Sequence, residues 1–142
     1  MKEPIWISRS VIETIQDELL IRFGGLPGLR DAGLLESALH KPQQAYCYGN
    51  PDLFDLAALY AFGIVKNHPF LDGNKRAGFM AAYTFLGANG CVIEATEADV
   101  VAHTLALASG EIDERVYAVF LRATCPAKRR PVRRKARPAA SR

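Results

Sequence analysis

The sequence has 142 residues, of which 49% are hydrophobic, and this predicts one globular domain with a full core. Its longest apolar runs, residues 56–65 and 77–88, are shorter than the roughly 18 residues of a membrane span, and Met1–Pro4 has no signal-peptide pattern, so we expect a cytoplasmic protein without membrane contact. The net charge of +3 is uneven, because residues 128–142 hold eight Lys/Arg and no acid, whereas the preceding chain is acidic.

The first segment predicts a short strand at Trp6-Ile7 and then a helix over residues 11–23. Ser10, followed three residues later by Glu13, is a capping-box pattern at the start of that helix. Apolar residues recur at helical spacing along it and form one stripe, namely Ile12, Ile15, Leu19 and Phe23. The glycine-rich segment 24–28 then ends the helix and forms a loop.

Two further helices are expected before the middle of the chain. Asp31 caps one that runs to about His40, and Pro42 is predicted to stop it. Asp52 caps the next, which runs to about Asn67, where Pro69 disfavours helical geometry at the preceding residue.

The second half predicts three more helices, near residues 74–88, 97–109 and 113–123. Their boundaries follow from Asn89-Gly90, the cap residue Thr96 and Gly110, and a second short strand is possible at Cys91–Glu94. The fold class is therefore all-α, a compact six-helix domain of residues 1–126 with at most a minor two-stranded β element. Residues 127–142 are expected to be a disordered basic tail, capable of weak nucleic-acid contact.

The three cysteines, Cys47, Cys91 and Cys125, are odd in number and widely spaced. This pattern predicts neither a disulfide framework nor a metal site.

The connection between the third and fourth helices combines a histidine, a carboxylate, a glycine and two cations between two apolar segments. Its sequence is His68-Pro69-Phe70-Leu71-Asp72-Gly73-Asn74-Lys75-Arg76. Histidine can move a proton near neutral pH, and a carboxylate such as Asp72 can hold Mg²⁺ beside a nucleotide. A glycine and free helix N–H groups favour a bound anion, which would offset the cost of two cations in a first helical turn. We therefore predict a phosphate site with a base beside it.

A purely structural interpretation is also open for each residue of this loop. Asp72-Gly73 is an ordinary turn dipeptide, His68 can cap a helix, and Lys75-Arg76 can be a solvated pair. The set as a whole favours a site. It is not a Walker loop, because the pattern G-x-x-x-x-G-K-[ST] does not occur.

These nine residues resemble the motif of the Fic/Doc superfamily, H-x-F-x-[DEN]-x-N-[GK]-R, at every constrained position. Lys75 resembles the death-on-curing (Doc) toxins, whereas AMP-transferases of the Fic branch have glycine there and a second arginine near position 79, where this chain has Phe79. The resemblance extends over residues 5–123 and includes the segment 23–39.

The resemblance implies a toxin of a type II toxin–antitoxin system that moves the γ-phosphate of ATP to a Thr/Ser hydroxyl of a translation factor such as elongation factor Tu. His68 would be the catalytic base, Asp72 the Mg²⁺ ligand, and Gly73, Asn74, Lys75 and Arg76 the nucleotide-binding residues. A Phd-like antitoxin in trans is the implied partner. A Fic-like AMP-transferase and a non-catalytic binding module are the alternatives.

Overall fold

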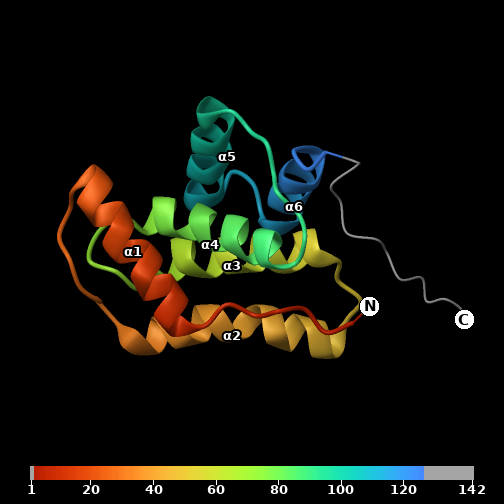
Figure 1. The fold of residues 1–142 in the computed structure, drawn as a ribbon, viewed down its shortest axis with the longest axis horizontal. Helices are drawn as coiled ribbons and strands as arrows, with labels where there is room; N and C mark the ends of the chain where they lie inside the picture. Colours follow the sequence, from red (N-terminus) through yellow and green to blue (C-terminus); the bar gives the residue numbers. More distant parts are fainter. Residues whose placement is uncertain (1, 127–142) are drawn as a thin grey trace, which may run out of the picture.

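The computed structural model describes residues 2–126 and confirms an all-α domain (Figure 1). The predicted tail, residues 127–142, lies outside the described residues. Six helices follow one another along the chain: α1 (Arg9–Phe23), α2 (Ala32–Tyr48), α3 (Leu53–Asn67), α4 (Asn74–Ala88), α5 (Glu97–Ser109) and α6 (Glu114–Ala123). None of the helices in the described part is long and apolar enough to cross a bilayer.

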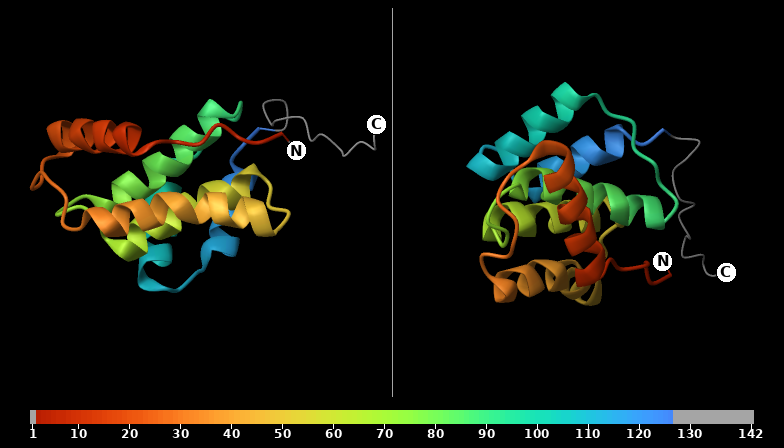
Figure 2. Two further views of the ribbon diagram at one scale, coloured as in Figure 1. Left: turned by 90° about the horizontal axis from the view of Figure 1, so that it is seen from below. Right: turned by 60° about the vertical axis from the view of Figure 1, so that its left-hand side comes forward.

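The central helix of the domain is α3, which lies between α2 on one side and α4, α5 and α6 on the other (Figures 1 and 2). Ten of its 15 residues are buried. The helices α2 and α4 approach α3 closely, and a glycine lies at each of the two crossings. A Cβ atom on Gly63 of α3 would lie 3.0 Å from Cβ of Ala38 in α2, and one on Gly78 of α4 would lie 2.7 Å from Cγ2 of Val65. Small residues thus allow the two crossings that set the positions of α2 and α4 around α3.

Cap residues fix most helix boundaries as the sequence predicts. The side chains of Asp31, Asp52, Thr96 and Asp113 each accept a hydrogen bond from a first-turn N–H group. The start of α1 is a correction, because Ser8, rather than Ser10, caps it by accepting from the N–H of Val11. Both serines allow a cap, and the sequence pattern alone selected the later one.

The end of α2 is a second correction, since Pro42 lies inside this helix and does not stop it. Proline removes one backbone donor and normally breaks a helix. Here the Pro42 ring is fully buried on the packed side of α2, and this burial offsets the lost hydrogen bond, so the helix continues to Tyr48.

The two short strands expected at Trp6-Ile7 and Cys91–Glu94 do not form. Among the described residues the β pairing is one isolated bridge, between Leu29 and Phe70. The backbone groups of the two segments find other partners. The N–H of Ile7 donates to the Tyr60 hydroxyl at 3.2 Å, and the N–H of Glu94 donates to the carbonyl of Thr124 at 2.7 Å.

The pairing of Cys91 with Cys125 corrects the prediction that the cysteines form no disulfide. The connection after α4 runs beside the end of α6, where the Glu94–Thr124 hydrogen bond lies, and this brings the two side chains together across 34 positions of sequence. Spacing along the chain carries no information about such a long-range approach. Cys47 is exposed and free.

Candidate functional site

The loop between α3 and α4 begins at His68, which both ends α3 and presents an exposed side chain. His68 has φ 55° and ψ 53°, in the left-handed region, and its N–H donates to the carbonyl of Ile64 at 3.0 Å. This conformation is uncommon for a residue other than glycine, and it turns the chain sharply out of the helix. The capping role and the functional role foreseen for His68 are therefore compatible, because the first uses its backbone and leaves the imidazole exposed.

The backbone of this turn is held by Arg30 from the loop between α1 and α2. Its Nε donates to the carbonyl of His68 at 2.7 Å, and its Nη2 donates to the carbonyl of Asn67 at 2.8 Å. These two carbonyls end α3, where positive charge is favourable. Arg30 could not be identified from the sequence, since its partners are backbone groups about 40 residues away.

The segment 24–31 runs beside the loop and pairs with it. The N–H of Arg30 donates to the carbonyl of Pro69 at 2.6 Å, and the N–H of Leu71 donates to the carbonyl of Gly28 at 3.0 Å. Both segments lie at the same end of the domain (Figure 1). The glycine-rich segment read as a plain loop in the sequence is therefore one wall of the site.

Asp72 carries an exposed carboxylate that is oriented by backbone donors. Its Oδ1 accepts from the N–H of Gly73 at 3.0 Å, and its Oδ2 accepts from the N–H of Leu26 at 3.3 Å. A carboxylate oxygen can accept more than one hydrogen bond, so each oxygen retains a lone pair for a further ligand.

Gly73 and Asn74 form the entrance to α4. Gly73 caps the helix with φ 77°, a conformation that favours glycine, and it provides no side-chain cap. The Asn74 side chain is buried: its Oδ1 accepts from the N–H of Phe70, and its Nδ2 donates to the Phe70 carbonyl, both at 3.0 Å. The side-chain amide of Asn74 thus closes the loop. Only the backbone N–H of this residue remains available to an anion.

Lys75 and Arg76 lie in the first turn of α4, and both side chains are exposed. The guanidinium of Arg76 lies 4.1 Å from the ring centroid of Phe23, the last residue of α1. This is a cation–π contact, and it holds the charge on the loop side of the domain. Of the six predicted site residues, His68, Asp72, Lys75 and Arg76 are therefore exposed, Gly73 is half-buried, and the Asn74 side chain is buried.

Lys66, two residues before His68, is directed elsewhere. Its Nζ donates to the carbonyl of Ala108 at 3.2 Å, near the end of α5. Although Lys66 and His68 are two positions apart, the Lys66 side chain reaches α5 rather than the loop.

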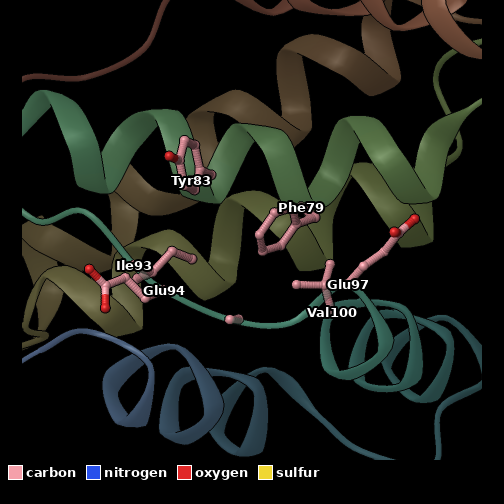
Figure 3. Close-up of a pocket in the computed structure, with 7 residues that line it drawn as sticks. Phe79, Tyr83, Ile93, Glu94, Glu97 and Val100 are labelled. Atoms are coloured by element: carbon pink, nitrogen blue, oxygen red, sulfur yellow. The ribbon is translucent and has the colours of Figure 1, made fainter.

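A separate hollow of about 380 Å³ lies between α4, α5 and the connection that joins them (Figure 3). It is lined by Phe79, Tyr83, Ile93, Glu94, Ala95, Glu97 and Val100. Phe79 occupies the position where the Fic motif continues with a second arginine. Its ring turns into this hollow, so position 79 contributes an aromatic surface to the space between two helices.

A metal ion at this loop would rest on the carboxylate of Asp72. Within residues 2–126 no group of three or more His, Cys, Asp or Glu side chains could hold a metal ion. Asp72 by itself fits Mg²⁺, which proteins commonly bind through one or two carboxylates together with the phosphates of a substrate. The donor set therefore suits a cation that arrives with a nucleotide.

The sequence model of the family described as Fic/DOC matches residues 6–86, which include the whole loop. "Toxin Doc" of Mycolicibacterium smegmatis is 45% identical over 78 residues, which cover 53% of this chain and 59% of that relative. "Protein kinase doc" of Escherichia phage P1 is 35% identical over 119 residues, which cover 82% of this chain and 92% of that relative.

Proposed function

This chain belongs to the Fic/DOC family, and we propose that it is a type II toxin that transfers the γ-phosphate of ATP to a Ser/Thr hydroxyl of a translation factor such as elongation factor Tu. The observation that carries the proposal is the complete motif on a braced loop, which joins an exposed histidine to a helix N-terminus that has no side-chain cap and carries two cations. The names of the two relatives, a toxin and a protein kinase, support it.

The reaction requires a base, an anion site and placement of the attacking hydroxyl in line with the leaving oxygen. In the proposal, His68 removes the proton from the target hydroxyl as its oxygen attacks the γ-phosphorus. The new O–P bond forms while the bond from that phosphorus to its bridging oxygen breaks, and ADP leaves. The first-turn N–H groups of α4, with Lys75 and Arg76, bind the phosphates and stabilise the charge on them.

Asp72 would hold Mg²⁺, which when bound neutralises phosphate charge. The carboxylate is exposed and is fixed by the N–H groups of Gly73 and Leu26, so it is aimed before the cation arrives. Gly73 would contribute its small size at the closest approach of backbone and phosphate, and Asn74 would contribute its backbone N–H and the closure of the loop.

Two residues favour γ-phosphate transfer over the alternative, protein AMP-transfer. Lys75 replaces the glycine of the AMP-transferase motif and adds charge and bulk at the helix start. Phe79 places an aromatic ring, not a guanidinium, on the next turn of α4. Both differences remove features that would set the α-phosphate in line with the hydroxyl. The intact motif argues against a non-catalytic binding module.

The proposed partners follow from the same assignment. An active toxin needs repression, and the sequence has no clear [ST]-x-x-x-E-[GN] inhibitory helix, which favours a Phd-like antitoxin that acts in trans. The target and the antitoxin would meet the protein in the cytoplasm.

Expression without a partner tests the toxin assignment. The chain should arrest bacterial growth, and His68→Ala should abolish arrest because the proposed base is lost. The fold should be retained, since the imidazole is exposed and the helix is ended by the backbone. His40→Ala, a change at another exposed histidine, is the matched control and should remain toxic. Equal toxicity of the His68→Ala protein would refute the base assignment.

A further inference from the structure

Gln16 is a polar residue in a buried position of α1, next to the proposed phosphate site. Ile12 and Gln16 are the two buried residues of this helix, and the Gln16 side chain is 2% exposed. Its Nε2 donates to the backbone carbonyl of Asp72 at 2.7 Å. Gln16 therefore reaches from α1 to the residue proposed to hold the cation, across 56 positions of sequence.

The carboxamide of Gln16 also packs directly against Gly73. A Cβ atom on Gly73 would lie 3.3 Å from Nε2 and 3.6 Å from Oε1 of Gln16. Together with the hydrogen bond to Asp72, this contact fixes the peptide that leads into α4 from the α1 side. Arg30 and Asn74 fix the same loop at His68 and Phe70, so Gln16 supplies the brace at the remaining part of the turn.

The other end of the Gln16 amide argues against a role in stability. Oε1 is buried and has no hydrogen-bond partner among the described residues. A buried acceptor without a partner is unfavourable, and an unbranched apolar side chain of similar length would fill the position without that cost. The amide orientation is defined, since the alternative would set Oε1 against the Asp72 carbonyl. A glutamine is thus required at this position only for its Nε2 donor, which binds the Asp72 carbonyl.

We infer that Gln16 is a positioning residue: by donating to the Asp72 carbonyl and packing on Gly73, it sets the direction of the Asp72 carboxylate and of the first N–H groups of α4. It touches neither nucleotide nor target and acts through Asp72 and Gly73. The inference rests on the proposed function for its consequence in nucleotide binding, whereas its effect on the loop is a property of the free protein.

Gln16→Met removes the donor and the unpaired acceptor together while keeping the length of the side chain. The expected result is an unchanged or higher melting temperature. Amide hydrogen exchange at residues 72–75 of the free protein should accelerate, and ATP binding in the presence of Mg²⁺ should weaken about tenfold by calorimetry. Gln44→Met, the same change at an exposed position of α2, should alter none of the three measurements.

The outcomes separate the two proposals. Unchanged exchange at residues 72–75 and unchanged ATP affinity in Gln16→Met would overturn the positioning role. A large fall in the melting temperature of Gln16→Met would also overturn it and assign Gln16 to the core. Absence of ATP binding in the wild type would contradict the proposed function and leave the hydrogen-exchange result to decide the role of Gln16.

Discussion

Arg76 shows how a neighbouring side chain determines where a charged group of the loop lies. Its guanidinium lies over the ring of Phe23, 4.1 Å from the centroid, and Phe23 is half-exposed at the end of α1. A long exposed arginine otherwise samples many rotamers, and ordering it on binding costs conformational entropy. The aromatic contact reduces that cost before a phosphate arrives.

Replacement of Phe23 should therefore weaken nucleotide binding without touching a nucleotide-binding residue. Phe23→Leu loses the cation–π contact, and we expect a loss of about 0.5–1 kcal/mol in ATP binding, the value of such contacts at exposed sites. Phe23→Tyr keeps the ring face and should bind as the wild type does. Calorimetry on the three proteins measures this, and equal affinities of Phe23→Leu and wild type would show that Arg76 is not held by the ring.

Direct removal of the two cations should have larger effects. Lys75→Ala and Arg76→Ala should each weaken ATP binding by about 1–3 kcal/mol, since each removes charge-assisted hydrogen bonds to phosphate. Arg115→Ala, at an exposed arginine of α6, controls for the change in net charge. Unchanged affinity in both loop variants would place the nucleotide elsewhere.

At the scale of single residues, the sequence indicated the exposed residues of the loop and missed the residues that brace it. His68, Asp72 and the two cations belong to one short motif, so adjacency reveals them. Gln16 and Arg30 act through backbone carbonyls of segments about 40 to 56 positions away. Such contacts leave no local pattern, and a glutamine in a helix looks like an ordinary surface residue.

Among the helices, glycine has opposite roles at two positions. Gly63 lies at the crossing of α3 with α2, where a Cβ would meet Ala38 at 3.0 Å. Gly87 lies near the end of α4, is exposed, and would meet nothing within 4 Å. Helix propensity favours alanine at both positions, so packing alone distinguishes them.

The two glycines give a paired prediction for stability. Gly63→Ala should lower the free energy of unfolding by about 1–3 kcal/mol, because backbone and Cβ atoms of Ala38 must shift. Gly87→Ala should raise it by up to about 1 kcal/mol. Chemical denaturation of both variants measures the two signs, and a stabilised Gly63→Ala protein would contradict the close crossing of α2 and α3.

Helix boundaries were predictable where a side-chain cap or a glycine stop defines them, as at Asp52, Thr96 and Gly110. They were not predictable where packing overrides local preference. Pro42 remains inside α2 because its ring is buried, and no property of the surrounding residues in the sequence indicates that burial.

For the whole molecule, two buried tyrosines link stability to alkaline pH. Burial raises the pKa of Tyr60 to about 12, although the N–H of Ile7 lowers it, and burial raises the pKa of Tyr117 to about 12 against a hydrogen bond with Thr104. Both phenols thus favour the neutral form in the folded state. Their contribution is complete below pH 10, where the unfolded chain also keeps them neutral, and it is lost as the pH rises toward 12.

We therefore expect the free energy of unfolding to decrease between about pH 10 and pH 12, by up to roughly 2–3 kcal/mol for each tyrosine. Tyr60→Phe should be less stable than the wild type at pH 7 by about 1 kcal/mol, since the N–H of Ile7 loses its partner. Its further loss between pH 10 and 12 should be smaller. Denaturation curves at pH 7, 10 and 11.5 measure both differences, and parallel pH profiles would contradict the linkage.

The all-α class and the six helices were predictable because each helix has its own apolar face and termini. The disulfide between Cys91 and Cys125 and the pairing of segment 24–31 with the loop were not, since both depend on how α1, α4 and α6 are arranged around α3. The same long-range arrangement brings segment 24–31 and Gln16 against the loop.

Transfer of phosphate from ATP to a protein hydroxyl is tested most directly by labelling ATP separately at the α- and γ-phosphates. The purified protein is incubated with each ATP, Mg²⁺ and bacterial lysate, with His68→Ala as the inactive control. We predict that label from the γ-phosphate appears on a target protein, that label from the α-phosphate does not, and that mass spectrometry finds a gain of one phosphate on a Ser or Thr. Transfer of the α-label with a whole nucleotide would contradict the kinase assignment and establish AMP-transfer.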